Sequence, residues 1–264
     1  MHRMVFFIEH IGATALRLLG SLRATLSFAL AILVRMFAPH AYNSAMRTVL
    51  IRQLYFTSVE ILPLFITVSV IVGSVLIGIV FQVLKSLGLT DLLGHILMGL
   101  VVTELSPFLT VILLTLRSSS AINAEIAVMN VSNELRTLAM FRIDTLNYLF
   151  LPRILNGIIS VVLLSVLFSI VVLISGLLYS MLIFGMSLDA YIDVLINALS
   201  LSDLIILFLK CATLGFFIAL IPILSGVNAS RELTGIPIAV LQGMVRVFIA
   251  VVIIEVLSLI LRFI

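Results

Sequence analysis

The sequence predicts an all-α integral membrane protein, and three observations support this fold class. First, 63% of the 264 residues are hydrophobic and only 10% are charged, whereas a soluble domain carries about 25% charged residues. Second, the mean hydropathy is +1.37, too apolar for a chain whose surface faces water. Third, the apolar runs suffice for about five helices of about 20–25 residues, the length that crosses a bilayer. We expect no separate soluble domain.

Five membrane spans are expected, separated by polar or charged connectors. Pro63 and Pro237 fall in the first turns of the first and fifth spans, where a helix tolerates proline. An odd number of spans cannot hold two equal inverted repeats, so any symmetry that the function needs would come from a homodimer. The expected spans are residues 61–84, 92–116, 154–184, 204–224 and 236–261.

The N-terminal segment, residues 5–37, carries arginines at intervals among apolar residues. This pattern is typical of an amphipathic helix, or a helix pair, in the membrane interface. The alternative is a true span over residues 22–34, which would be short for a bilayer. The arginines also argue against a cleavable signal peptide. The expected organisation is therefore residues 1–60 with interfacial and elbow helices, then a five-helix transmembrane domain over residues 61–264.

Positive charges indicate the orientation. The N-terminal segment and residues 117–153 carry most of the arginines, whereas the opposite side has Lys85 and the near-terminal Arg262. Because cytoplasmic loops are enriched in Lys and Arg, we expect the N-terminus and residues 117–153 in the cytoplasm. Five spans then place the C-terminus outside.

Four charged residues lie within the expected spans, where an ionised side chain costs about 2.5–3.5 kcal/mol on insertion scales. Glu104 and Arg246 lie at comparable depths, and so do Lys210 and Glu255. We therefore expect a Glu104–Arg246 pair and a Lys210–Glu255 pair. Either the pairs only neutralise each other and fix helix packing, or they line a cavity that receives a polar headgroup.

The segment from about residue 117 to 145 is the most polar stretch between two spans. Residues 121–140 carry too many polar groups to continue a span comfortably, yet their apolar residues recur at helical spacing. They form either an amphipathic helix resting on the membrane or a docking helix that a partner protein grips. The candidate docking residues are Arg117, Glu125, Met129, Glu134 and Arg136.

The sequence lacks the residue patterns of several activities. There is no GxxxxGK[ST] phosphate loop, and the only lysines are Lys85 and Lys210, so we expect no NTPase site in this chain. The four histidines are scattered without metal-ligand spacing, and the single cysteine, Cys211, permits no disulfide framework. We expect no catalytic residues, metal or cofactor in this chain, and no nucleic-acid partner.

A set of short motifs occurs in a fixed order along the chain. They are Arg52-Gln53-Leu54-Tyr55, Glu104-Leu105-Ser106-Pro107, Thr110, Arg117-Ser118-Ser119-Ser120-Ala121, Ala124-Glu125-Ile126-Ala127-Val128-Met129, Glu134-Leu135, Ile143-Asp144, Pro152-Arg153, Lys210, Ser225-Gly226 and Glu255. Together they resemble the MlaE family, the permease subunits of lipid-transporting ABC systems that work with MCE proteins. The resemblance covers about residues 45–260.

The sequence departs from the family pattern near these motifs. Ser106, Leu116, Ser119, Ala127 and Arg142 stand where the family has glycine, and Thr145 stands where it has proline. We expect the second and third helices and the cytoplasmic segment to pack less closely than in typical members.

The resemblance implies a homodimer of five-span subunits with an N-terminal interfacial helix. It also implies that the cytoplasmic helix between spans two and three docks onto an ATPase subunit, which binds ATP. The dimer would enclose a lipid site open to the periplasm, beneath a periplasmic MCE assembly, and Glu104 matches a position near that site. The candidate pocket residues are Glu104, Arg246, Lys210 and Glu255.

The function expected from this resemblance is that of a non-enzymatic permease in the bacterial inner membrane. It would move phospholipid or a similar amphipath between that membrane and a periplasmic MCE-type partner, driven by the separate ATPase. Two alternatives remain: a secondary transporter or channel that uses Glu104 as an intramembrane proton or ion site, and a structural membrane scaffold.

Overall fold

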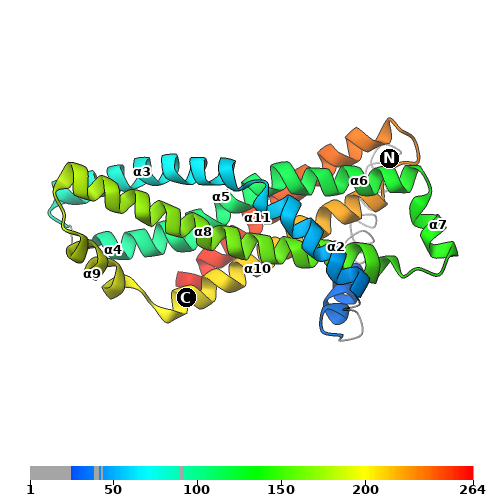
Figure 1. Cartoon of the computed structure of the whole chain (residues 1–264), viewed down its shortest axis with the longest axis horizontal. Coiled ribbons are helices and arrows are strands. Elements are labelled where there is room, and N and C mark those ends of the chain that lie inside the picture. The colour runs from blue at the N-terminus through cyan, green and yellow to red at the C-terminus, as the bar shows by residue number, and fades with distance from the viewer. Residues whose placement is uncertain (1–24, 39–41, 43, 90–91, 264) are drawn as a thin grey trace, which may run out of the picture.

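The computed structural model describes residues 25–38, 42, 44–89 and 92–263, which form helices joined by short connections (Figure 1). No strand occurs among these residues. Five helical stretches are long and apolar enough to cross a membrane. The predicted all-α membrane fold with five spans is therefore confirmed.

Each stretch contains one or more helices, in which η denotes a short π-helical segment. The first, Met46–Leu87, comprises most of α2 (Ser44–Leu54), η2 (Tyr55–Val59) and α3 (Leu62–Leu87). The second, Leu93–Val131, comprises α4 (Leu93–Ile96), η4 (Leu97–Leu105), α5 (Ser106–Leu114), η5 (Thr115–Ser119) and α6 (Ser120–Val131). The third, Leu146–Ile183, comprises η6 (Leu146–Phe150) and most of α8 (Leu151–Phe184). The fourth is α10 (Leu201–Val227), and the fifth, Gly235–Arg262, lies in α11 (Gly235–Phe263).

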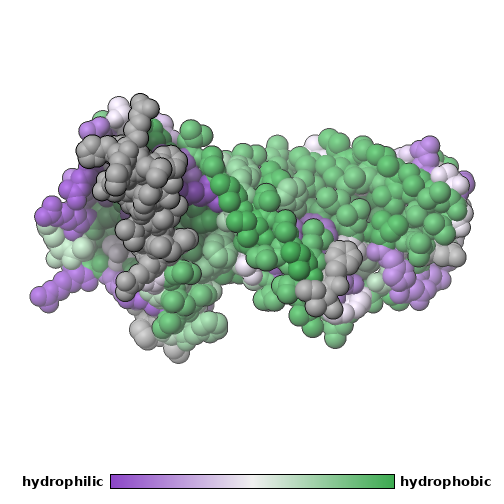
Figure 2. Space-filling view, turned by 180° about the vertical axis from the view of Figure 1, so that it is seen from behind, coloured by the Kyte–Doolittle hydropathy of each residue, from purple (hydrophilic) through white to green (hydrophobic). Residues whose placement is uncertain are grey.

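Three shorter helices complete the described chain: Thr25–Met36, α7 (Glu134–Met140) and α9 (Leu188–Ala198). Figure 1 shows α7 at one end of an elongated bundle and α4 and α9 at the opposite end. Figure 2 shows an apolar belt between two ends that carry polar side chains. This distribution matches a protein whose middle faces lipid and whose ends face water.

The second stretch is longer than predicted, which corrects one expectation. Its 39 residues extend about 58 Å at 1.5 Å per residue, more than the about 40–45 Å of a bilayer with its headgroups. Polar residues near its end therefore need not enter hydrocarbon. The prediction that residues 121–140 could not continue the second helix is wrong for α6, and the break falls at Asn133, whose φ is 59°.

The structure describes only part of the predicted N-terminal segment. Residues 1–24 of it lie outside the described residues, whereas Thr25–Met36 is helical. Ile32 of this helix is fully buried, and the Phe28 ring packs edge-on against Phe150 with centroids 5.7 Å apart. The helix thus packs on η6 and its neighbours. Helix α2 continues through η2 almost directly into α3.

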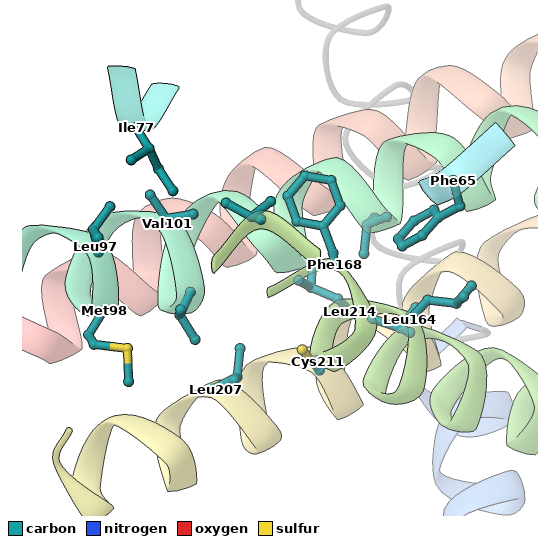
Figure 3. Packing of buried hydrophobic residues seen from close by; sticks show 14 of the residues in the cluster. Phe65, Ile77, Leu97, Met98, Val101, Leu164, Phe168, Leu207, Cys211 and Leu214 are labelled. Carbon is teal, nitrogen blue, oxygen red and sulfur yellow. The ribbon is translucent and has the colours of Figure 1, made fainter. Parts of the chain in front are cut away.

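The main core lies between α3, α8, α10 and the second stretch. Figure 3 shows Phe65 of α3 near Phe168 of α8, whose ring centroids are 5.7 Å apart. A glycine contact brings α8 close to α10: a Cβ added at Gly157 would lie 2.6 Å from the Gly215 carbonyl oxygen. Small residues at such crossings allow membrane helices to approach closely, so the fold holds α10 firmly against α8.

Candidate functional site

A buried network of charges joins three of the five long stretches. The ammonium of Lys210, on α10, donates to carboxylate oxygens of Glu104 on η4 and Glu255 on α11, each at 2.5 Å. The Lys210 side chain is only 1% exposed, and those of Glu104 and Glu255 are 12% and 13% exposed. Lys210 lies nine residues after Leu201, about 14 Å along the helix. The network therefore reaches into the apolar part of the bundle.

A second cation, Arg262, joins the network from the last turn of α11. Its Nη1 atom donates to the carbonyl of Gly99 at 2.6 Å, to Oγ1 of Thr103 at 2.7 Å and to Glu104 at 3.3 Å. Its Nη2 atom lies 3.4 Å from a carboxylate oxygen of Asp203. A Cβ at residue 99 would lie 2.9 Å from Nη2, so glycine leaves room for the guanidinium.

The network holds more acidic than basic groups. It contains the carboxylates of Glu104, Glu255 and Asp203 but only two cations, Lys210 and Arg262. Oε1 of Glu255 is buried and has no hydrogen-bond partner among the described residues. Buried charges are stabilised only when they are paired and hydrogen-bonded. Removing one charge from this network should therefore destabilise the charges that remain.

The structure confirms one predicted pair and corrects the other. Lys210 is paired with Glu255 as predicted, but the predicted partner of Glu104, Arg246, is exposed and lies elsewhere. A helix turns about 100° per residue, so Arg246 lies about 180° around α11 from Glu255. Arg262 lies on nearly the same face as Glu255. Depth estimated from sequence could not supply this rotation about the helix axis.

Glu104 and its neighbours lie on a π-helical segment. In η4 the backbone carbonyls of Gly99 and Thr103 accept side-chain hydrogen bonds from Arg262 and Lys210, respectively. Such segments inside α-helices occur frequently at functional sites. Here the segment presents both a carboxylate and backbone acceptors to the two cations.

The predicted docking residues fall into two groups. Arg117 forms an ion pair with Glu60 at 3.0 Å, and Glu125 forms one with Arg153 at 2.6 Å. These pairs connect η5 to the junction between η2 and α3 in the first stretch, and α6 to α8. Both charges are therefore engaged within the chain.

The second group lies around α7. Met129, at the end of α6, packs on the core cluster around Ile126, whereas Glu134 and Arg136 are exposed. Met140 and Phe141, at the end of α7, are 68% and 73% exposed. Helix α7 lies at one end of the bundle (Figure 1), and the exposed side chains at this helix include both charged and apolar groups.

Polar side chains of α6 find partners on α10 and α11. The Asn123 amide donates to the carbonyl of Ala239 at 3.1 Å, and Asn130 donates to the carbonyls of Val227 and Ala229 at 3.0 Å. These bonds give partners to the amide nitrogens of side chains that the sequence suggested were too polar for a continuous helix.

Two buried serines of the second stretch form interhelical hydrogen bonds. Ser106 donates to the carbonyl of Ser165 at 2.5 Å, and Ser119 donates to the carbonyl of Ile218 at 2.8 Å. Both serines are buried. The two serines thus link the second stretch to α8 and α10.

The connection from α7 to η6 contains a strained residue and a cap. Arg142 has a φ of 56°, in the left-handed region that favours glycine. Asp144 pairs with Arg35 and accepts from the backbone N–H of Leu146 at 3.1 Å. Partial burial alone would raise the pKa of Asp144, but Arg35 and the backbone donors together hold it below its usual value.

The five long apolar helices and the ion network between them define a multi-pass membrane protein with a polar centre. Comparison with known sequences makes the class more specific. The chain belongs to the family described as Permease MlaE, whose model matches residues 50–261. It is thus a component of a membrane transporter.

Individual relatives are similar at modest identity. The permease protein MlaE of an intermembrane phospholipid transport system in Haemophilus influenzae is 27% identical over 203 residues, 76% of this chain and 78% of that protein. A probable ABC transporter permease protein of Rickettsia felis is 24% identical over 243 residues, 92% of each chain. The chloroplastic Arabidopsis thaliana protein TRIGALACTOSYLDIACYLGLYCEROL 1 is 30% identical over 168 residues, 62% of this chain. The match spans about half of that Arabidopsis protein, 48% of its length.

Proposed function

We propose that the chain is the permease subunit of an ABC transporter that moves phospholipid or a similar amphipathic lipid. Transfer would run between the bacterial inner membrane and a periplasmic MCE-type partner, and a separate ATPase would bind ATP and supply the energy. The name of the Haemophilus relative, an intermembrane phospholipid transport protein, supports the lipid substrate. The chain itself would carry out no covalent chemistry and hold no cofactor.

The observation that carries this proposal is the Glu104–Lys210–Glu255 network. It connects η4, α10 and α11, so a movement of one helix alters the partners of the other two. Intramembrane ionisable groups commonly mark substrate pathways. The network would contact the polar part of the lipid at one stage of transfer. Arg246, the remaining predicted pocket residue, would take no part in that contact.

Helix α7 is the element that we assign to the ATPase. Its exposed side chains, Glu134, Arg136 and Met140, offer charged and apolar contacts at the end of the bundle opposite α9. The ion pairs of Arg117 and Glu125 would transmit movement of α7 and α6 to the first and third stretches. The end that carries α7 also holds most of the described arginines, which supports a cytoplasmic location for it. The C-terminal end of α11 would then be periplasmic.

A homodimer would complete the transporter. Helix α11 supports a homodimer, because only 11% of the residues in its most apolar 18-residue segment are buried within one chain. The outward side chains of this helix include Leu241, Val245, Ile249, Val252 and Val256, all at least half exposed. A second copy would cover part of this surface and enclose the lipid site.

The proposal is tested by affinity purification of the tagged chain from native membranes. The expected result is co-purification of an ATPase subunit and an MCE protein, with phospholipid detected by mass spectrometry. Arg136→Glu on α7 should abolish recovery of the ATPase while the chain still folds and inserts. Arg231→Glu, a matched charge reversal in the loop after α10, should leave recovery unchanged. Recovery of the chain without an ATPase would contradict the proposal.

The competing function, a secondary transporter or channel, predicts a different result. If Glu104 is a proton or ion site, the purified chain alone should carry ions across liposomes, and Glu104→Gln should abolish that flux. The permease proposal predicts no flux from the chain alone. A structural scaffold predicts that Glu104→Gln has no effect on lipid transfer.

A further inference from the structure

A second polar region lies far from the Glu104 network, at the end of the bundle that carries α7. It is a cavity of about 540 Å³ between α2 with η2, η5 with α6, and η6 with α8. This volume is within the about 300–1,000 Å³ typical of small-molecule sites. Five charged side chains line it: Arg52, Glu60, Arg117, Glu125 and Arg153.

Arg153 is the buried cation of this cavity. Its side chain is only 4% exposed, and one side of its guanidinium holds Glu125 at 2.6 Å. The other terminal nitrogen, Nη1, is buried and has no hydrogen-bond partner among the described residues. A guanidinium has five N–H donors arranged to match phosphate or carboxylate oxygens. Arg153 therefore has a donor to offer an anionic group.

The charge of the cavity favours an anion. Glu60 and Glu125 are neutralised by Arg117 and Arg153. The remaining cation, Arg52, has no ion pair among the described residues. Three arginines and two glutamates leave one positive charge in excess. Arg52 is exposed, whereas Arg153 is buried.

The walls of the cavity are partly apolar. Phe56 and Tyr148 line it and are 52% and 42% exposed, and Ile122 lines it as well. Aromatic groups beside arginines suit a ligand that has both an anionic and an apolar part. A small inorganic anion would leave these walls in contact with water.

The depth of the cavity matches the headgroup region of a bilayer. Arg117 lies 24 residues after Leu93, about 36 Å along the second stretch. The hydrocarbon layer is about 30 Å thick, and the bilayer with its headgroups is about 40–45 Å thick. If Leu93 lies at one hydrocarbon boundary, Arg117 lies near the headgroup level of the opposite leaflet.

We propose that this cavity binds the phosphate group of an amphiphile from the leaflet on the α7 side. Arg52 and the free nitrogen of Arg153 donate to the phosphate oxygens, and Phe56 and Tyr148 contact the carbons next to it. The site goes beyond the transport function proposed above, because it is separate from the Glu104 network and can bind lipid without any transfer.

The test is photo-crosslinking on the purified full-length chain in maltoside detergent and phosphate-free buffer. The probe is a phosphatidic acid with a diazirine near its glycerol, and the comparison probe is a diacylglycerol with the same diazirine. We expect the phosphatidic acid to label peptides that contain Phe56 or Tyr148, and the diacylglycerol to label them about ten-fold less, because it lacks the phosphate that accepts charge-assisted hydrogen bonds. Labelling needs no partner and no transport, so it is independent of the proposed function.

Three variants make the test specific. Arg153→Gln removes the buried donor, and Arg52→Gln removes an exposed cation whose loss leaves the packing intact. Ala121→Phe fills the cavity without changing its charge. Each should reduce labelling about ten-fold, whereas Arg231→Gln, an exposed arginine outside the cavity, should not. Equal labelling by both probes, labelling elsewhere, or undiminished labelling of Arg52→Gln and Ala121→Phe would overturn the proposal.

Competition by inorganic phosphate identifies the source of the anion. Labelling that persists in a large excess of phosphate assigns the site to a lipid headgroup, as proposed. Displacement by phosphate at concentrations similar to the probe would overturn the lipid assignment and define a site for free phosphate.

Discussion

Lys210 and Glu104 are 106 positions apart in the sequence, yet the lysine ammonium lies 2.5 Å from a glutamate carboxylate oxygen. The contact ties α10 to η4, and the same ammonium holds Glu255 of α11 at 2.5 Å. Removing one partner of a buried ion pair costs about 3–5 kcal/mol, because it leaves a charge uncompensated. The three helices are therefore coupled through one nitrogen atom.

Arg262 should stabilise this network from the end of α11. Arg262→Gln would leave the Gly99 carbonyl and Glu104 with fewer donors, and we expect it to lower the free energy of unfolding by about 1–3 kcal/mol. Thermal unfolding in detergent measures the effect. The matched control is Arg246→Gln, on the opposite face of the same helix, which should change stability by less than about 0.5 kcal/mol. Equal effects of the two variants would show that the hydrogen bonds of Arg262 contribute little.

Arg142 should be replaceable by glycine with a gain in stability. Its φ of 56° costs an L-residue about 1–2 kcal/mol, and glycine adopts this conformation freely. Arg142→Gly should therefore raise the unfolding temperature. The same change at Arg136, inside α7, should lower it, because glycine costs about 1 kcal/mol in a helix interior. A loss of stability in Arg142→Gly would mean that the arginine side chain makes a stabilising contact.

The Asp144–Arg35 pair should give a pH-dependent contribution to stability. The pKa of Asp144 is lower in the folded chain than its usual value of 3.8, so the contribution is fully present above that value. It is lost as the pH falls through the lower, folded pKa. Both side chains are about a third or more exposed, so Asp144→Asn should cost at most about 1 kcal/mol.

Limited proteolysis between residues 139 and 147 measures this effect. Cleavage should increase in Asp144→Asn at neutral pH, and in the parent chain only at acidic pH. An unchanged cleavage rate in the variant would indicate that Arg35 does not hold this connection.

The sequence predicted the fold class and the five spans, because long apolar runs permit few other structures. It placed Lys210, Glu255 and Glu104 as important intramembrane charges, and the structure joins all three. It missed Arg262 and Asp203 as partners, since both fall just outside the expected spans 236–261 and 204–224. It also paired Glu104 with Arg246, because the depth of a residue does not give its direction around the helix.

The continuity of α6 with the second stretch was missed for another reason. Asn123, Glu125 and Asn130 indicated a boundary near Arg117. Their partners, the Ala239 and Val227 carbonyls and Arg153, lie far away in the sequence. Long-range hydrogen bonds of this kind satisfy polar side chains without leaving any local pattern. The ion pair between Glu60 and Arg117 was unpredictable on the same grounds.

The central claim, that the charge network takes part in transfer, needs a variant that keeps the fold but removes the charges. The single variant Lys210→Met should have a much lower free energy of unfolding than the parent, because Glu104 and Glu255 stay buried without their cation. The triple variant Glu104→Gln, Lys210→Met, Glu255→Gln should recover most of that stability.

The most direct measurement is ATP-dependent phospholipid transfer by this triple variant, reconstituted with the proposed ATPase and MCE-type partners. We expect a folded complex that hydrolyses ATP but transfers lipid at least about ten-fold more slowly than the parent, a barrier increase of about 1.4 kcal/mol. Transfer at the parental rate would contradict the claim and leave the network a purely structural role.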